Sequence, residues 1–401
     1  MREAVIVDAV RTPIGRGKPG GALSGWHPAD LLGEVLSDLV DRTGVDPGTI
    51  DDVITGCVSQ AGQQAFNIAR HGLLAAGFPE SVPATSVDRQ CGSSQQAVHF
   101  AAQGVIAGSY DIAIAAGVES MSRVPMFSSA MGEDPAGPRV ADRYRDRGGL
   151  VNQGISAEMI AAKWGFSRED LDRFSAESHQ RAARATADGS LSREIHPLAV
   201  DRGEGPTGET MTADEGIRPD STPESLAGLR PAFFSDELAA KYPDLNWVVT
   251  AGGASQLSDG AAAVMVMERS VAERLGLRPR AAIRHMTVVG DDPIMMLTGV
   301  IPATHRVLER AGMTMADIDV FEVNEAFAPV VLAWAREFDA DLAKVNVNGG
   351  AIANGHPLGA SGAKLMTALL NVLEQTDGRF GLQTMCEGGG MANATIVERL
   401  A

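Results

Sequence analysis

The sequence predicts an α/β fold built from two similar halves. Strand-like and helix-like segments alternate up to about residue 116, and the same alternation returns after residue 280. Gly44 precedes Ile50 by six positions and Gly312 precedes Ile318 by six, each time between a helical run and a strand. The two motifs lie 268 positions apart, which indicates a duplication; a chance match among common residues is the alternative.

The N-terminal half has the order expected of a sheet whose strands are joined through helices. Short β-rich runs alternate with longer helical runs, as in α/β proteins. The expected strands are Ala4–Val7, Val53–Cys57, Pro83–Val87 and Ile112–Ala116, and the expected helices are Ala29–Arg42, Asn67–Ala76 and Ser93–Ala107.

The alternation fails between Glu119 and about Thr250, where the chain is rich in Gly, Pro, Arg and Asp. Helices are expected at Ala157–Trp164 and Glu169–Ala187, the second preceded by a capping box at Ser167–Asp170. A long, partly irregular insertion usually forms a substrate or partner surface. A flexible linker is the alternative, but these helices and the apolar anchors argue against it; the anchors are Trp164, Phe174 and Leu229.

The C-terminal half repeats the pattern. The expected strands are Ala281–Val288, Val320–Val323, Phe380–Cys386 and Ala392–Val397, and the expected helices are Pro302–Ala311, Ala326–Phe338 and Ser361–Leu373. The shift of 268 positions carries Cys91 to position 359, three residues beyond His356. Equivalent corners of the two halves are therefore expected to supply reactive groups, because ligands gather beyond the carboxyl ends of strands.

Composition and charge exclude several classes of protein. The 401 residues are 44% hydrophobic, and Phe100–Val118, the least polar region, is broken by polar residues, so no membrane span is expected. The N-terminus lacks the pattern of a signal peptide, which predicts a cytoplasmic protein. The net charge of −17 argues against nucleic acid or an anionic membrane as the main partner.

The cysteines and histidines predict neither a disulfide framework nor a metal site. The three cysteines are Cys57, Cys91 and Cys386, an odd number without a Cys-x-x-Cys pair, and the eight histidines show no His-x-x-x-His spacing. Cys91 lies where the run Pro83–Val87 gives way to a helix. Unpaired N–H groups and the helix dipole at that point favour a nucleophilic thiolate, although a small buried hydrophobic residue is the alternative.

Three motifs in the C-terminal half favour a nucleophilic Cys91 over the alternative of a buried hydrophobic residue. They are Asn324–Ala328, the glycine-rich Gly349–Gly362 around His356, and Cys386–Gly390. A nucleophilic Cys, a distant His that can take its proton, a second Cys and glycine-rich turns with free backbone donors form a coherent acyl-transfer set. Together with Cys91 and the opening Val5–Pro13, the motifs resemble the thiolase family over essentially the whole chain.

The resemblance implies a fold and a division of the chain. It implies the thiolase fold, with two βαβαβαββ halves forming a layered α/β/α/β/α core and an inserted loop domain. Residues 1–119 with 251–275 would form the N-terminal half, 120–250 the loop domain over the coenzyme A site, and 276–401 the C-terminal half. Thiolases are generally dimers or tetramers, so a homodimer or homotetramer is expected.

The resemblance also implies how a 3-ketoacyl-CoA would be cleaved. Cys91 attacks and carries the acyl group, His356 accepts its proton, and Cys386 protonates the acetyl-CoA enolate. His356 and a water held by Asn324 receive the enolate oxygen, while the N–H groups of Cys91 and Gly388 receive the tetrahedral oxyanion. Glu325 orients either His356 or the start of a helix. Coenzyme A is a co-substrate, and no permanently bound cofactor is expected.

Six further positions match the coenzyme A contacts of the family. Arg218 and Ser225 would lie around the adenine, Ala251 and Ser255 along the pantetheine, and Ala326 and Phe327 near the thiol, although Arg218 could also be a solvated surface charge. The glycine-rich run is no phosphate loop, since Gly-Lys-Ser/Thr does not follow it. The segment Thr250–Gln256 departs from the family pattern at two places.

Other departures from the family pattern bear on which substrate the protein would accept. Asn152 and Gln153 stand where many thiolases have His-Met, which predicts a more polar acyl pocket. Glu387 is unusual beside Cys386; it could keep that thiol protonated or simply point outward. The Cys91 and Cys386 motifs together look most like degradative actinobacterial thiolases, including those of steroid-ring breakdown.

Three alternatives remain beside this interpretation. A biosynthetic acetoacetyl-CoA thiolase would use the same groups in reverse, and a non-catalytic acyl-CoA carrier could keep the fold. A ketosynthase shares the acyl-Cys chemistry but typically uses two histidines, so Asn324 and Cys386 favour thiolase.

Overall fold

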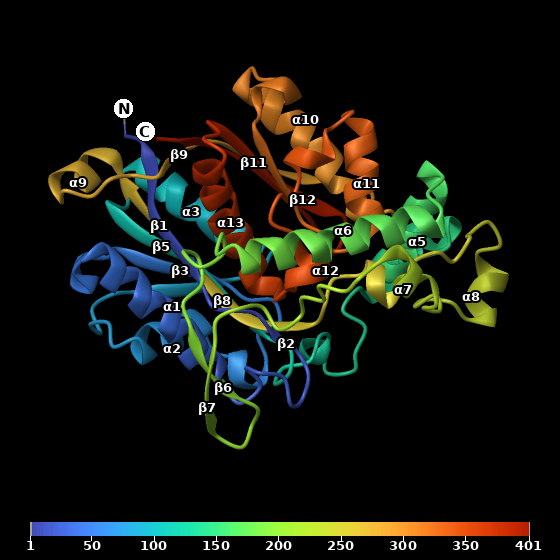
Figure 1. Ribbon diagram of the computed structural model, residues 1–401, viewed down its shortest axis with the longest axis horizontal. Helices are drawn as coiled ribbons and strands as arrows, with labels where there is room; N and C mark the ends of the chain where they lie inside the picture. The colour runs from blue at the N-terminus through green and yellow to red at the C-terminus, as the bar shows by residue number, and fades with distance from the viewer. Residues whose placement is uncertain (1, 401) are drawn as a thin grey trace.

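The computed structural model describes residues 2–400 and is organised around one mixed ten-stranded sheet (Figure 1). Its strands are β1 (Ala4–Arg11), β2 (Gly15–Arg16), β3 (Asp52–Gly56), β4 (Ala84–Val87), β5 (Ile112–Ser120), β8 (Ser258–Glu268), β9 (Ala281–Gly290), β10 (Val320–Val323), β11 (Phe380–Glu387) and β12 (Met391–Arg399). They run in the order β10-β11-β12-β9-β1-β8-β5-β3-β4, and β2 pairs with β8. A separate hairpin joins β6 (Leu198–Asp201) to β7 (Pro206–Met211).

Helices cover and separate the two halves of this sheet. Those of the repeated halves are α1 (Pro28–Thr43), α2 (Ile68–Ala75), α3 (Ser93–Ala107), α10 (Val300–Ala311), α11 (Ala328–Glu337), α12 (Ala351–Asn354) and α13 (Ser361–Gln375), with α9 (Arg269–Arg274) between the halves. The insertion holds α4 (Gly137–Tyr144), α5 (Gln153–Trp164), α6 (Arg168–Ala187), α7 (Pro223–Ala227) and α8 (Asp236–Lys241). No helix within residues 2–400 is long and apolar enough to cross a membrane.

The halves of the sheet meet at β1 and β9, which share only the pairs Val5–Ala282 and Ile6–Ala281. The buried apolar residues form three large clusters around them. One lies between the N-terminal strands and α1 and α2, one between the C-terminal strands and α10 and α11, and the third surrounds α3 and α13, which pack together. This arrangement confirms the layered α/β/α/β/α core.

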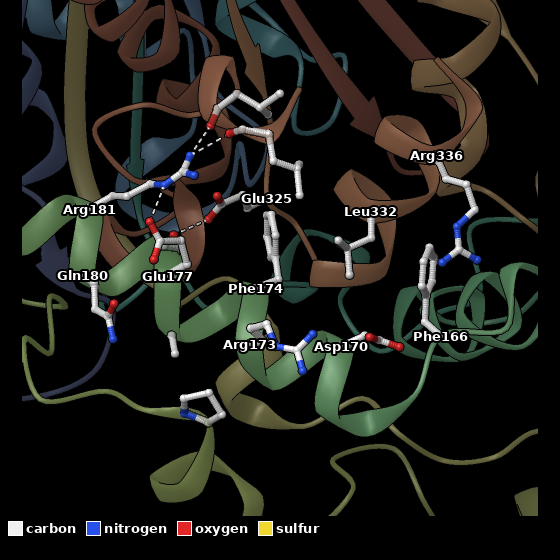
Figure 2. Close-up of a pocket in the computed structure, with 15 residues that line it drawn as sticks. Phe166, Asp170, Arg173, Phe174, Glu177, Gln180, Arg181, Glu325, Leu332 and Arg336 are labelled. Carbon is white, nitrogen blue, oxygen red and sulfur yellow. Dashed lines mark hydrogen bonds and ion pairs between the residues drawn. The ribbon is translucent and has the colours of Figure 1, made fainter. Parts of the chain in front are cut away.

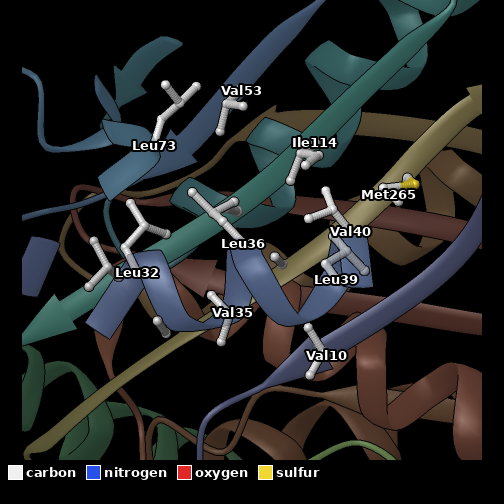
Figure 3. Close-up of a cluster of buried hydrophobic side chains, with 14 of the residues drawn as sticks. Val10, Leu32, Val35, Leu36, Leu39, Val40, Val53, Leu73, Ile114 and Met265 are labelled. Carbon is white, nitrogen blue, oxygen red and sulfur yellow. The ribbon is translucent and has the colours of Figure 1, made fainter. Parts of the chain in front are cut away.

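Helix α1 shows how local sequence builds an outer layer. Pro28 occupies its first turn, the His27 side chain accepts a hydrogen bond from the Ala29 N–H, and Gly44 ends it in a left-handed conformation. Its apolar face is fully buried against β5 and β8 through Leu32, Val35, Leu36 and Leu39 (Figure 3). Each such side chain contributes roughly 2 kcal/mol when removed from water.

The structure confirms the repeat. A shift of 268 positions carries α3 onto α13, and β3 and β5 onto the strands β10 and β11. Each strand and helix of the repeated halves that we expected is present, with ends that differ by a few residues. The capping box is also present, with Ser167 and Asp170 bonding reciprocally at the start of α6.

Several elements were missed, above all β8, which lies between β1 and β5 in the middle of the sheet. All eleven of its residues are buried, so its Ala-rich apolar run shows no inside–outside alternation. The hairpin β6–β7 and the short helices α4, α7, α8 and α12 also escaped notice, because they are too short to show a period. The boundaries of the three expected domains remain a prediction.

Candidate active site

The turn between β4 and α3 places Cys91 at the centre of the fold. Asp88 Oδ1 accepts the N–H of Gln90 at 2.7 Å, and Ser93 Oγ donates to the Gln90 carbonyl at 2.6 Å, which together fix the tight turn. Cys91 is 4% exposed and packs beside Leu358. The backbone N–H groups of Cys91 and Gly388 and the Gln153 side chain each lower the pKa of its thiol.

Burial nevertheless raises the pKa of the Cys91 thiol to about 12, and Glu387 adds to this rise. Backbone N–H groups do favour the thiolate, as expected, but burial outweighs them. Removing the sulfur from water costs the anion more than the nearby N–H groups return. Cys91 is a neutral thiol at neutral pH, and a base must take its proton during the reaction.

His356 is the base expected from the sequence. Ser361 Oγ donates to the Pro357 carbonyl at 2.9 Å, so the hydroxyl oxygen accepts the Nδ1–H of His356 at 2.5 Å. The free lone pair of His356 is then on Nε2, which lies 3.4 Å from Asn324 Nδ2. Burial, followed by the charge of Lys364, lowers the pKa of His356 to about 3, so the imidazole is neutral.

Cys386 approaches the same point from the end of β11. It is fully buried, and its pKa lies well above the ordinary value because of burial, then the proximity of Cys91 and Glu387. Cys386 is thus held as a protonated thiol close to the first. Glu387 is also fully buried, so the alternative that it points outward is wrong.

Glu325 supports the site from behind. Its carboxylate accepts hydrogen bonds from Ser178 Oγ at 2.7 Å, Asn346 Nδ2 at 2.9 Å and the Ile352 N–H at 3.2 Å. Ile352 lies in the first turn of α12, the segment that leads to His356, and no hydrogen bond joins Glu325 to the imidazole within residues 2–400. Of the two roles considered for Glu325, its contacts match the helix start.

A cavity of about 360 Å³ opens onto His356. Its walls are mostly apolar and come from the core and from the insertion. Three of the expected coenzyme A contacts line it, namely Ser255, Ala326 and Phe327. Asn152 and Gln153 both line it, and the Asn152 side chain also caps α5 by accepting the Ile155 N–H at 3.1 Å. Of the two polar departures, Gln153 is the one whose side chain lowers the pKa of Cys91.

The other expected coenzyme A contacts lie outside this cavity, on the surface of the insertion. Arg218 and Ser225 are exposed, and Ser225 Oγ is part of the capping box of α7. Ala251 is exposed next to Gly252, whose Cα packs beside Leu226 of α7. A surface path therefore leads from α7 past Ala251 to Ser255, whose N–H donates to the Ala326 carbonyl at 2.9 Å.

A larger cavity, of about 430 Å³, lies between α6 and α11 (Figure 2). It contains neither sulfur, and of the groups above it shares Glu325 and Ser178. Charged side chains of its wall are engaged with other residues of the same wall: Arg181 donates to Glu177 and to the carbonyls of Leu342 and Val345. Arg336 stacks over Phe166 at 4.2 Å. We assign no chemistry to it.

Sequence reasoning missed several residues of the site. Ser361 orients His356 from five positions along the chain, and its place at the start of a predicted helix was the available clue. Met121, Phe127 and Phe233 line the cavity from the insertion, where no periodicity singled them out. Gln256, one of the departures from the family pattern, donates to the carbonyls of Gly216 and Ile352 and so ties the insertion to α12.

Comparison with known proteins agrees with this geometry. The model of the family "Thiolase, N-terminal domain" matches residues 4–270, and that of "Thiolase, C-terminal domain" matches residues 277–399. A steroid 3-ketoacyl-CoA thiolase, FadA6, of Mycobacterium tuberculosis is 48% identical over 408 residues, which cover 100% of this chain and 95% of the relative. A 3-ketoacyl-CoA thiolase of Erwinia tasmaniensis is 47% identical, with full coverage of both chains.

The structural comparison leads to the same group. The crystal structure of the Bacillus anthracis acetyl-CoA acetyltransferase superposes with a TM-score of 0.87 at 36% identity, covering 100% of this chain and 99% of that one. These matches confirm the resemblance inferred from the motifs.

Proposed function

Because the chain belongs to the thiolase family, we propose that it cleaves a 3-ketoacyl-CoA with coenzyme A through an acyl-Cys91 intermediate. The products are acetyl-CoA, or a related acyl-CoA, and a shortened acyl-CoA. The observation that carries the proposal is that the turn of Cys91 packs against the segment of Cys386: a Cβ on Gly92 would lie 2.0 Å from Glu387 Oε1, and a Cβ on Gly388 would lie 3.0 Å from Gln90 Oε1. The protein is an acyltransferase, and coenzyme A is its co-substrate.

The first half of the reaction forms the acyl-enzyme. Cys91 attacks the keto carbonyl as His356 Nε2 takes its proton, and the N–H groups of Cys91 and Gly388 stabilise the oxyanion. The bond between the α and β carbons then breaks. The enolate of acetyl-CoA that leaves is stabilised by His356 and by a water held on Asn324, and Cys386 protonates its carbon. Each well-placed donor contributes on the order of 3 kcal/mol.

The second half releases the acyl group. Cys386, left as a thiolate, takes the proton of the coenzyme A thiol as that thiol attacks the acyl-Cys91 thioester. The bond between the acyl group and Cys91 breaks, and the Cys91 sulfur regains its proton from His356. We place Ser255, Ala326 and Phe327 along the pantetheine and thiol, and Arg218, Ser225 and Ala251 farther out toward the adenine. An exposed Arg218 on that path supports this, since the phosphates need a local cation on a chain of net charge −17.

We further propose a role in fatty-acid or steroid degradation by a cytoplasmic homodimer or homotetramer. The names of the curated relatives favour degradation, and the biosynthetic alternative has no better support. A partner chain would find two suitable features: β4 is an edge strand of the sheet, and Phe66 and Phe127 are 91% and 74% exposed.

Coenzyme A-dependent cleavage of a panel of 3-ketoacyl-CoAs tests the function. We expect turnover of long or ring-bearing substrates; turnover of acetoacetyl-CoA alone would contradict the degradative assignment. Cys91→Ala should abolish the acyl-enzyme detected by mass spectrometry. Cys386→Ala should still be acylated by acetyl-CoA but should lose condensation, and equal loss of both steps would contradict its role as the carbon acid.

A further inference from the structure

We propose that Glu387 is a positioning residue that confines the buried site to one negative charge, so that Cys91 ionises readily only while the Glu387 carboxyl is neutral. The inference rests on the proposed function, because it assigns to Cys91 the role of nucleophile. It concerns a group that does not line the cavity and does not touch the substrate.

The carboxyl of Glu387 lies against the backbone beside the nucleophile. A Cβ built on Gly92 would stand 2.0 Å from Glu387 Oε1, so only glycine leaves room for the carboxyl at this position. Gly92 has a φ of −85°, which any residue adopts, and close approach is therefore the reason for the glycine. Cys91 precedes Gly92 and Cys386 precedes Glu387, so the carboxyl adjoins both reactive segments.

No protein group satisfies this carboxyl. Within residues 2–400, neither oxygen of Glu387 accepts a hydrogen bond, and Asn393 Nδ2, its neighbour, donates instead to the Gly92 carbonyl at 3.1 Å. Glu119 is equally buried, yet it accepts hydrogen bonds from the N–H groups of Val58, Ser59 and Gly359 and from Gln64. The contrast separates a buried carboxyl that has donors for its ionised form from one that has none and is most stable when protonated.

The pKa of the Glu387 carboxyl lies near the pH range in which enzymes work. Burial raises its pKa to about 8, Arg89 opposes the rise and Asp88 adds to it. Arg89 forms no ion pair with Glu387 within residues 2–400. On α3, burial lowers the pKa of His99 to about 3, so it carries no charge, and the facing residues of β12, Met391 and Asn393, do not titrate.

The consequence is that the ionised forms of Glu387 and Cys91 disfavour each other. We call this the charge limit at the nucleophile. Below about pH 8 the carboxyl is neutral, so a thiolate that forms at Cys91 meets no negative charge at Glu387. Above that pH an ionised Glu387 stands beside the sulfur and raises its pKa further. The ionised carboxyl should therefore suppress the thiolate at alkaline pH, where an isolated thiol would become more reactive.

The test is the rate at which iodoacetamide alkylates Cys91 between pH 6.5 and 9.5, followed by mass spectrometry of the Cys91 peptide. Glu387→Gln keeps the shape and removes the charge. We expect its rate to equal that of the wild type at pH 6.5 and to exceed it about tenfold at pH 9.5, which corresponds to one pKa unit at Cys91. Glu387→Asp should restore the alkaline suppression.

Glu322→Gln is the matched control, because Glu322 is another fully buried carboxyl without a hydrogen-bond donor among residues 2–400. Its alkylation profile should follow the wild type. A Glu387→Gln to wild-type ratio that is the same at every pH would overturn the proposal, since a packing defect acts at all pH values. If Glu387→Gln does not fold, an Asp variant that keeps the alkaline suppression supports the charge limit, and an Asp variant without any suppression contradicts it. Cleavage activity that persists in all variants would leave the thiolase assignment standing if the charge limit fails.

Discussion

At the scale of single residues, burial sets the protonation of the reacting groups. It raises the pKa of Cys91 to about 12 and lowers that of His356 to about 3, so the pair is neutral before substrate arrives. A proton can then move from sulfur to imidazole only as the attacked carbonyl takes up the negative charge under the N–H groups of Cys91 and Gly388. On the proposed mechanism, we therefore expect the rate to depend on the orientation of His356 Nε2.

Ser361→Ala should expose this dependence. Without the Ser361 hydroxyl, His356 Nδ1 loses its acceptor at 2.5 Å, and both the tautomer and the ring orientation become less defined. We expect kcat to fall roughly tenfold to a hundredfold with little change in KM, by analogy with the loss of partners that orient other ligating or basic histidines. Steady-state kinetics of 3-ketoacyl-CoA cleavage measure this.

Thr367→Val is the control for Ser361→Ala. Thr367 lies on the same helix, α13, is fully buried, and donates to the carbonyl four residues earlier, as Ser361 does. It does not touch His356, so kcat should stay close to that of the wild type. Equal losses of kcat in the two variants would show that the hydroxyl supports the helix and not the imidazole.

At the scale of elements, a helix or strand could be predicted from the sequence when one of its faces is buried and the other is exposed. Helix α3 was predicted with its exact bounds, and α1 within one residue at each end, because polar residues bound their apolar runs. Strand β8 was missed because it is covered on both faces. For the site, the motifs predict Cys91, His356 and Cys386 as the reacting groups, and their roles remain a prediction. The contacts of Gln153 and Ser361 depend on how the insertion and α13 pack, which no local pattern records.

The capping box at the start of α6 contributes to the free energy of unfolding through two residues that are local in the sequence. Ser167 accepts the N–H of Asp170, and Asp170 accepts the N–H of Ser167. We expect Ser167→Ala to lower the free energy of unfolding by about 1 kcal/mol, measured by urea denaturation, without changing kcat. Ser167→Asn, which keeps a capping oxygen, should recover most of the loss; no recovery would mean that the hydroxyl acts through another contact.

At the scale of the whole molecule, the site exists because the insertion is fixed to the core. The cavity draws Gln153 and Phe233 from the insertion and His356 and Ala326 from the C-terminal half. A central attachment is Arg11, which β1 carries into a fully buried ion-pair cluster. Its guanidinium donates to Glu194 at 2.8 Å and to both oxygens of Asp214 at 2.7 and 3.0 Å.

Arg11→Met should therefore loosen the insertion as a unit. It leaves the buried carboxylates of Glu194 and Asp214 without their cation, which costs about 3–5 kcal/mol for a pair of this kind. Arg16→Met is the matched control. Arg16 pairs at 2.7 Å with Glu215, the residue after Asp214, but the Arg16 side chain is 43% exposed. Exposed ion pairs of this kind contribute about 0–1 kcal/mol. Urea denaturation gives the free energies, and limited proteolysis shows whether cleavage concentrates between residues 190 and 215. If both variants lose the same stability and resist protease equally, the insertion is held mainly by its apolar contacts, and the buried ion pairs do not fix it to the core.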